Sequence, residues 1–383
     1  MKNMKVITIR ISSGSHRRFY VPISLELPSG LVSEYKSGFI KDVYTGAICP
    51  LQINAFSEGF AEASFIVDHM EPYEEKVLEL HLREEPGEAE FESEMKLEES
   101  EKEIKIFSGK FLITSYRFLD VVKPYLYPLN AGIGLSVTED GPQDHIHHRS
   151  LWTAHGDVNG VDIWSEEPNH GFIEHKAFLS LASGPVFAEI RAENVWTGPN
   201  GERLLDEIRT IRVWNIPSKD WLIDYTVNLR AIYGDVKLGD TKEAGILSIR
   251  VCPSLTVKGG EGRITNSFGG VNEEETWGRR AHWCDYSGKL GNEVYGVAVF
   301  DYLENFRHPT YWHVRDYGLM AANVFGISHF KRIRSPEGVY ILRKGEQLTF
   351  KYRIYVHKGD AREANVAQKY LDYVCPPKIT VPG

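Results

Sequence analysis

The sequence predicts an all-β protein with a C-terminal helix. Short segments alternate between apolar and polar residues or are rich in β-branched residues, as strands are. The clearest of these segments span residues 6–11, 77–82, 186–193 and 222–229. Turn-forming Gly, Pro and Asn recur between such segments, at residues 199–201, 258–260, 336–338 and 344–346. Clear helical periodicity is found mainly near the end of the chain, so strands dominate the expected fold.

The expected C-terminal helix follows Asp360, a residue type that caps helix N-termini. Four apolar residues are spaced to fall on one helical face: Ala364, Ala367, Leu371 and Val374. Pro376 and Pro377 then stop the helix, because proline cannot continue it.

One change of composition divides the chain. From Glu84 to Lys105 the sequence is crowded with Glu and Lys and has few apolar residues. Solvated hairpin strands or a connector explain such a stretch, and an acidic interaction surface is the alternative. We take it as the boundary between a small N-terminal β-sandwich, residues 1–100, and a larger β-domain, residues 106–383.

Size and charge exclude several classes of protein. The 383 residues suit one large domain plus a smaller one, and a net charge of −9 argues against a nucleic-acid partner. The four cysteines form no CxxC pair, which is typical of free thiols in a reducing compartment. No apolar run approaches the roughly 20 residues of a membrane helix. We expect a soluble, cytoplasmic protein without a membrane partner, and the oligomeric state, a homo-oligomer included, stays open.

The segment from Gln143 to Trp164 is the most informative part of the sequence. Four of the fourteen histidines lie between residues 145 and 155, among carboxylates, an arginine and tryptophans. If the segment is extended, His145 and His147 share one face, and two imidazoles so placed can chelate a metal ion at about 2.1 Å. Candidates for a third ligand are His155, Glu243, His282, His308 and His313. The alternatives are histidines that act as acids and hydrogen-bond a sugar, and histidines bonded to backbone carbonyls.

Glu243 introduces a carboxylate just before an apolar strand pattern at residues 246–251. In such a place it either pairs with Lys242 or a neighbouring arginine, or serves as a general base.

A further polar and aromatic cluster spans residues 305–318, with Asn323 soon after it, and Trp277 and Trp283 flank a similar mixture. Tryptophan and tyrosine rings stack on the C–H faces of sugar rings, while Arg, Asp and Asn reach hydroxyls. Together these clusters predict a pocket for a polyhydroxylated ligand. Neither a phosphate-binding glycine loop nor a GxSxG elbow is present, so nucleotide cofactors and a serine nucleophile are not indicated.

At these residues the chain resembles a known family. The matching segments are 123–129, 144–152, 155–162, 239–243 and 307–319. They resemble the soluble bacterial proteins named methane oxygenase PmoA, over roughly Lys123 to Ala367. Ser150 departs from the glycine that is usual in that family.

The resemblance implies a fold and a chemistry, but no methane oxidation. The methane-oxidising subunit from which the name comes is embedded in a membrane, and this sequence has no membrane segment. The soluble proteins look instead like distant relatives of the galactose-mutarotase-like proteins. That relationship implies a large antiparallel β-supersandwich for the second domain and sugar-ring chemistry with His and Glu as acid and base.

The resulting hypothesis is a carbohydrate-active enzyme of the mutarotase or epimerase, glycoside-cleaving or lyase type, acting on a small-molecule carbohydrate. The expected catalytic residues are His145, His147, His148 and Glu243. The expected substrate-binding residues are Arg149, His155, Asp157, His313, Arg315, Asp316 and Asn323. No cofactor is firmly implied, and a divalent metal on His145 and His147 is the alternative. Two other functions stay open: a metal-dependent oxygenase or lyase, and a non-catalytic sugar-binding protein.

Overall fold

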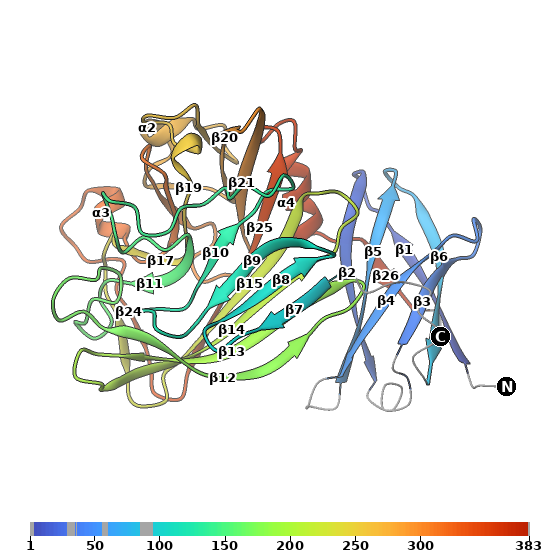
Figure 1. Ribbon diagram of the computed structural model, residues 1–383, viewed down its shortest axis with the longest axis horizontal. Coiled ribbons are helices and arrows are strands. Elements are labelled where there is room, and N and C mark those ends of the chain that lie inside the picture. Colours follow the sequence, from blue (N-terminus) through green and yellow to red (C-terminus); the bar gives the residue numbers. More distant parts are fainter. Residues whose placement is uncertain (1–3, 29–34, 36, 56–59, 85–94, 382–383) are drawn as a thin grey trace.

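The computed structural model describes residues 4–28, 35, 37–55, 60–84 and 95–381, and within them it consists mainly of antiparallel strands (Figure 1). These strands form sheets of seven, nine, eight and two strands. All four segments singled out as strands are strands, so the predicted all-β class is confirmed.

The seven-stranded sheet is built largely from the N-terminal residues. Its strands are β1 (Met4–Ser12), β2 (Arg18–Pro28), β3 (Ser37–Asp42), β4 (Ile48–Ala55), β5 (Phe60–Met70), β6 (Glu75–Arg83) and β26 (Lys378–Thr380). The first half of β4 pairs with β3 and the second half pairs with β5, so the sheet folds over on itself. A separate apolar core, which includes Ile9, Phe65 and Leu80, lies inside it.

The larger part of the molecule is a sandwich of the nine- and eight-stranded sheets. The nine-stranded sheet contains β7 (Met95–Glu99), β8 (Glu103–Ser108), β9 (Phe111–Arg117), β10 (Tyr125–Leu129), β11 (Leu151–His155), β17 (Ala244–Arg250), β19 (Arg279–Arg280), β22 (Tyr311–Val314) and β23 (Leu319–Asn323). The eight-stranded sheet contains β12 (Phe172–Ala182), β13 (Phe187–Thr197), β14 (Arg203–Trp214), β15 (Trp221–Arg230), β18 (Arg263–Asn266), β20 (Trp283–Leu290), β21 (Glu293–Asp301) and β25 (Gln347–Lys358).

The main core lies between these two sheets. It joins residues of the nine-stranded sheet, such as Ile113 and Leu151, to residues of the eight-stranded sheet, such as Val227 and Ile354. Because strand side chains alternate between faces, each sheet also has an outer face. Tyr125 and Trp152 belong to a smaller cluster outside the main core, on the outer face of the nine-stranded sheet.

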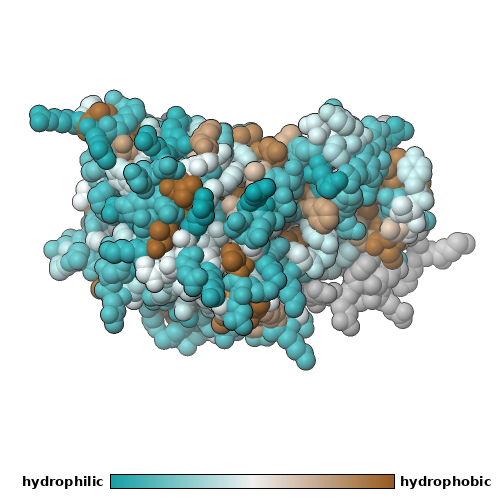
Figure 2. Space-filling model, turned by 90° about the horizontal axis from the view of Figure 1, so that it is seen from above, coloured by the Kyte–Doolittle hydropathy of each residue, from teal (hydrophilic) through white to brown (hydrophobic). Residues whose placement is uncertain are grey.

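The remaining elements are short. They are β16 (Val236–Leu238), β24 (Tyr340–Leu342), η1 (Pro253–Leu255), α2 (Asn272–Thr276), α3 (Ile327–Lys331) and α4 (Val366–Val374). Within the described ranges, every helix falls short of the length and apolarity needed to cross a lipid bilayer. Seen from above, hydrophilic side chains cover most of the surface, and apolar ones form small separate patches (Figure 2).

The predicted C-terminal helix is present as α4, but its cap and its buried face were wrong. Asp360 instead accepts the N–H groups of Arg362 and Glu363 in a turn that precedes the helix. The helix begins only after Asn365, so its phase differs from the expected one. Val366, Tyr370 and Asp372 are its buried residues, whereas Ala367 and Leu371 are exposed.

Two strands lie across the boundary expected near residue 100. β7 forms a hairpin with β8 at the edge of the nine-stranded sheet, although its residues precede that boundary. β26 returns to pair with β1 in the seven-stranded sheet. Part of the acidic stretch, residues 85–94, lies outside the described residues. The two-domain division itself stays a prediction.

Side chains join the seven-stranded sheet to the sandwich. Gln52 Oε1 accepts the backbone N–H groups of Val186 and Phe187 at 3.1 and 3.0 Å. Arg212 of β14 forms an ion pair with Glu62 of β5 at 2.6 Å. These contacts fix the N-terminal strands against the eight-stranded sheet.

Candidate functional site

One row of paired residues crosses the outer face of the nine-stranded sheet. Directly paired residues on neighbouring strands point to the same side of a sheet. The pairs link Arg117, Tyr125, Trp152, Ser248, Ala321 and His313 in that order. The expected aromatic and histidine residues of β11 and β22 therefore share one face. Trp164 and the partly buried Tyr317 pack against the apolar part of this face.

The histidine segment does not form a strand, so the predicted extended H-x-H geometry was wrong. The N–H of His145 donates to Pro142 O at 3.1 Å, and the N–H of His148 donates to His145 O at 2.9 Å. These bonds form two successive turns in place of an extended chain. The turns gather all three imidazoles. The ring centroids of His145 and His148 are 4.6 Å apart, those of His147 and His148 are 4.7 Å apart, and those of His145 and His147 are 5.7 Å apart.

Ser150 leaves these turns with a φ of +45°. Glycine adopts this left-handed region without steric penalty, whereas a residue with a Cβ is strained there. This backbone shape gives a physical reason to expect glycine at this position. In this chain the Ser150 hydroxyl donates to Thr138 Oγ1 at 2.7 Å, which helps to hold the strained residue.

His148 is the buried member of the group. Its ring stacks on Trp152 with centroids 5.3 Å apart, and only 1% of the residue is exposed. Burial, reinforced by the neighbouring His147 and His145, lowers its pKa far below the ordinary value. The His148 ring is therefore neutral at neutral pH.

His145 is held from both sides. Its ring stacks on Tyr317 at 4.8 Å, and its Nδ1 lies 3.0 Å from Asp144 Oδ2. Arg250 of β17 fixes the same carboxylate with two hydrogen bonds of 2.8 and 2.9 Å. The exposed turn is thereby tied to the sheet beneath it.

His147 is half-buried and faces charges of both signs. Burial lowers its pKa, and the positive charges of Lys123 and His145 lower it further. The carboxylates of Glu166 and Glu243 oppose this shift. At neutral pH the His147 ring is thus neutral, with one N–H donor and one bare nitrogen acceptor.

Glu243 is the last residue before β17, and 42% of its side chain is exposed. Its carboxylate forms an ion pair with Lys242, which is the first of the two roles that the sequence left open. The negative charge of Glu243 acts on the pKa of His147, His313 and Tyr317 alike, so the carboxylate is an electrostatic neighbour of all three.

His313 and Asn323 fix the backbone that carries Glu243. His313 Nδ1 donates to Lys242 O at 2.7 Å. Asn323 Nδ2 donates to Thr241 O and Lys242 O at 3.0 and 3.1 Å. Burial lowers the pKa of His313 to about 4, although Glu243 opposes the shift. Both residues, expected to bind substrate, are buried and support Glu243 from below.

The sequence did not single out two residues next to this group, Lys123 and Glu166. Arg149 donates to Glu166 through Nε at 3.0 Å and Nη2 at 2.5 Å. Lys123 Nζ lies 3.6 Å from the same carboxylate and donates to Trp164 O at 2.8 Å. Burial lowers the pKa of Lys123 to about 8. A lysine inside the apolar segment 121–129 was the available signal, whereas the position of Glu166 left no trace in the sequence.

Four of the predicted substrate-binding residues make other contacts. His155 is fully buried and packs edge-on against Phe325, 5.0 Å between centroids. Asp157 closes a turn by accepting the Gly160 N–H at 2.9 Å. Arg315 Nε lies 3.0 Å from Glu273 Oε1. Asp316 Oδ1 accepts the N–H of the same glutamate at 2.9 Å. Of the four, Arg315 also lies over the ring of Tyr317, 5.6 Å from its centroid, whereas these contacts of His155, Asp157 and Asp316 are with residues outside the histidine group.

The candidates for metal binding are also divided. His282 and His308 form a separate group with Asp301. Throughout the ranges that the structure describes, no three His, Cys, Asp or Glu side chains are placed to hold a metal ion together. His145 and His147 offer two neighbouring imidazoles, and a metal site there stays a proposal.

Comparison with known proteins gives a family. A family model described as "Family of unknown function (DUF6807)" matches residues 104–371, more than half of the 383 residues. The chain belongs to the DUF6807 family. The match includes the whole nine-stranded sheet from β8 onward and every residue of the histidine group, and the name PmoA does not appear in it. No curated protein matches the chain.

Two of the solved structures that are similar to this DUF6807 chain come from Enterococcus faecalis. One is a protein in the Glycosyl Hydrolase Family 38, with 14% identity, a TM-score of 0.47 and coverage of 99% of this chain and 47% of that chain. Another is an alpha-mannosidase from strain V583, with 12% identity, a TM-score of 0.43 and coverage of 99% and 46%. The chain spans about half the length of these proteins. A likeness at these values carries no activity over to the chain.

Proposed function

We propose that this DUF6807 chain is a carbohydrate-active enzyme that performs acid–base chemistry on a sugar at the outer face of the nine-stranded sheet. One observation carries the proposal. The turns at residues 142–148 pack three imidazoles against Tyr317, and the charge of Glu243 reaches His147. We infer that this carboxylate and the neutral imidazole reach one ligand, the first as a proton acceptor and the second as a hydrogen-bond donor.

The surrounding residues suit a polyhydroxylated ligand. Burial raises the pKa of Tyr317 to about 12, so its phenol keeps its proton and donates a hydrogen bond. The Tyr317 ring is partly exposed, although His145 stacks on it and the guanidinium groups of Arg250 and Arg315 lie over it, and its exposed part is the proposed contact with the sugar. In the proposed mechanism Glu243 accepts a proton from the sugar, and the N–H of neutral His147 donates a hydrogen bond to the oxygen that gains charge.

The roles of the remaining histidines follow from burial. His148 is neutral and buried, so it orients its neighbours and does not exchange protons near neutral pH. His145 lies closer to solvent, with 33% of its side chain exposed, and hydrogen-bonds substrate. This assignment keeps the four expected catalytic residues together but gives them unequal roles.

The experiment is a turnover screen on the full chain with monosaccharides, oligosaccharides and oxidised sugars. Polarimetry and NMR detect anomer exchange and epimerisation, reducing-end assays detect glycoside cleavage, and ultraviolet absorbance detects the double bond that a lyase creates. Glu243→Gln and His147→Gln should each reduce the rate of the reaction found in this screen by roughly 10²- to 10⁴-fold, as the loss of an acid or base does. Glu174→Gln, on the exposed part of β12, is the matched carboxylate control. Unchanged rates in both site variants would refute the mechanism.

The metal-dependent alternative rests on the proximity of His145 and His147. Elemental analysis near one equivalent of metal per chain, together with activity that a chelator removes and zinc, manganese or iron restores, would favour it. Sugar binding that His147→Ala weakens, without turnover of any sugar tried, would identify a non-catalytic binding protein. The resemblance to proteins with the PmoA name contributes the expectation of sugar chemistry, and we infer no methane chemistry from it.

A further inference from the structure

A second histidine group lies apart from the first. His282 and Asp301 belong to the eight-stranded side of the sandwich, directly before β20 and at the end of β21. Tyr370 of α4, whose ring is 5.7 Å from that of His282, belongs to the cluster on the outer face of this sheet. The histidines of residues 145–148 lie on the outer face of the other sheet. The two groups share no residue.

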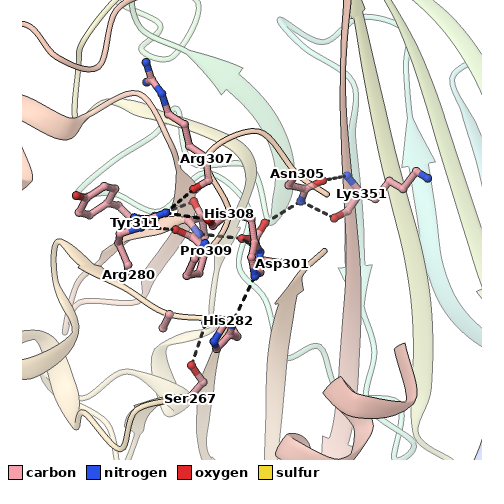
Figure 3. A network of polar contacts seen from close by, with 12 residues as sticks. Ser267, Arg280, His282, Asp301, Asn305, Arg307, His308, Pro309, Tyr311 and Lys351 are labelled. Carbon is pink, nitrogen blue, oxygen red and sulfur yellow. Dashed lines mark hydrogen bonds and ion pairs between the residues drawn. The ribbon is translucent and has the colours of Figure 1, made fainter. Parts of the chain in front are cut away.

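Three side chains form a hydrogen-bonded chain in this second group (Figure 3). His308 Nδ1 is 2.7 Å from Asp301 Oδ2, and His308 Nε2 is 3.1 Å from His282 Nδ1. An ionised carboxylate only accepts, so a neutral His308 ring has its proton on Nδ1 and accepts through Nε2. The proton shared with His282 is therefore on His282 Nδ1. This order leaves His282 Nε2 as a bare acceptor at the outer end of the chain.

The inner end of this chain is held rigidly. Asp301 is fully buried and accepts the Asn305 amide at 2.7 Å and the Thr310 N–H at 2.8 Å. Arg280 donates to the carbonyl oxygens of His308 and Pro309, each at 2.8 Å, which clamps the loop that carries His308. A carboxylate fixed in this way stabilises positive charge that arises on either imidazole.

The outer end lies beside an exposed ring and a free hydroxyl. Phe268 is 67% exposed, and its ring centroid is 5.4 Å from that of His282. Asn266 Oδ1 accepts the N–H groups of Phe268 and Gly270 at 3.0 Å each, so the turn that presents this ring is fixed. Among the described residues, the Tyr370 hydroxyl is buried without a hydrogen-bond partner, although buried hydroxyls nearly always have one.

We infer that His282 is the centre of a second binding site, which takes a hydroxyl compound with a flat apolar face. The flat face rests on Phe268, and the hydroxyl donates its hydrogen bond to His282 Nε2. The Tyr370 hydroxyl is the unpaired group left to meet the same ligand. A sugar and a phenol both have this chemistry.

The test uses the full chain with ¹⁵N-labelled histidine, and phenol and methyl β-glucoside as probes. Each histidine ring gives two ¹⁵N resonances, one from Nδ1 and one from Nε2. The His282→Gln and His69→Gln variants identify which resonances belong to these two residues. His69 is the matched control because its ring lies 5.2 Å from the exposed Phe19 and 3.1 Å from a carboxylate of Glu71, without a second histidine. Without probe, the ¹⁵N shifts should show the His282 proton on Nδ1 and a bare Nε2.

At least one probe should change the ¹⁵N chemical shift of His282 Nε2 in a saturable manner. The same probe should leave the chemical shifts of His69 unchanged. A response to phenol alone identifies an aryl hydroxyl, and a response to the glucoside alone identifies a sugar. Phe268→Ala, at an exposed position, should lower the affinity for the responding probe by roughly two- to ten-fold, the range expected for one ring contact. A protonated Nε2, equal shifts at His69 and His282, silence with both probes, or an unchanged affinity in Phe268→Ala overturns the inference.

Discussion

The Nδ1 atom of His313 lies 2.7 Å from the carbonyl oxygen of Lys242, and the Asn323 amide meets the same oxygen at 3.1 Å. A residue of β22 and a residue of β23 thus fix the last peptide before β17. Glu243 follows that peptide directly. Its position is set by the sheet beneath it, because within the described part of the chain its side chain contributes only the ion pair with Lys242.

Asn323→Ala should destabilise the protein by about 1–3 kcal/mol, because it leaves buried backbone groups without partners. The amide oxygen of Asn323 also accepts the N–H groups of Phe325 and Gly326, at 2.8 and 2.9 Å. Urea unfolding measures the free-energy change. Asn200→Ala, at an exposed turn, should change the free energy of unfolding by only a few tenths of a kcal/mol. Equal stability of the two variants would show that the Asn323 contacts carry little weight.

Tyr317→Ala should weaken sugar binding by about 0.5–1.5 kcal/mol, because the ring that stacks on His145 and faces the proposed ligand is lost. Tyr317→Phe should retain most of the affinity, since it removes only the hydroxyl. Isothermal titration with the sugar found in the turnover screen measures both. If the phenylalanine variant loses as much as the alanine variant, hydrogen bonding and not ring stacking dominates.

Stability should fall as the pH falls from 6.5 toward 4. The pKa of His155 and of His313 is lowered from 6.5 to about 4 by burial, and that of His148 is lowered further. Below pH 6.5 the unfolded chain binds protons that the folded chain does not, so the folded state loses relative stability in this window. For His155 alone the loss is on the order of 3 kcal/mol.

Urea unfolding at several pH values measures this dependence. His155→Gln removes one depressed imidazole and should flatten the profile between pH 6.5 and 4. His69→Gln, whose side chain is 41% exposed in the folded protein, should leave the profile unchanged. A steeper profile in His155→Gln would contradict the assignment of this residue.

The buried ion pair between Arg18 and Asp372 should couple the N-terminal sheet to α4. Their atoms are 3.2 Å apart, with side chains only 1% and 2% exposed. Arg18→Met alone should cost up to about 3–5 kcal/mol, because it leaves the buried Asp372 with Lys369, 3.9 Å away, as its remaining cationic partner. Adding Asp372→Leu should recover part of that loss.

A double-mutant cycle in urea measures the coupling of this pair. The neighbouring pair Arg17–Glu71 is the control, since its side chains are 62% and 49% exposed. Its coupling should be about 0–1 kcal/mol. Equal coupling in both cycles would mean that burial does not strengthen the Arg18 pair.

The strands were predictable because burial of one face imposes a period of two on the sequence. In β15, for example, Tyr225, Val227 and Leu229 face the core while Asp224 and Thr226 do not. The same rule could place Trp152 and His313 on their strands. It could not show that paired registers bring them to one face, because register depends on partners far away in the chain.

The shape of the histidine segment was predicted wrongly although a signal was present. Gly141, Pro142 and Asp144 are residue types that favour turns, and they directly precede His145. The H-x-H pattern was given more weight than those residues. The pairing of Lys123 with Glu166 could not be predicted, because nothing local relates two residues that far apart.

The pairing of β26 with β1 has a consequence for folding on the ribosome. Lys378, Ile379 and Thr380 cover the backbone of β1 at Ser12, Ile11 and Arg10. During synthesis these three residues emerge long after the other six strands of that sheet. Until then the backbone edge of β1 is open to pairing with a neighbouring nascent chain. Early association of chains on one message is therefore a hazard that β26 reduces where it covers Arg10, Ile11 and Ser12.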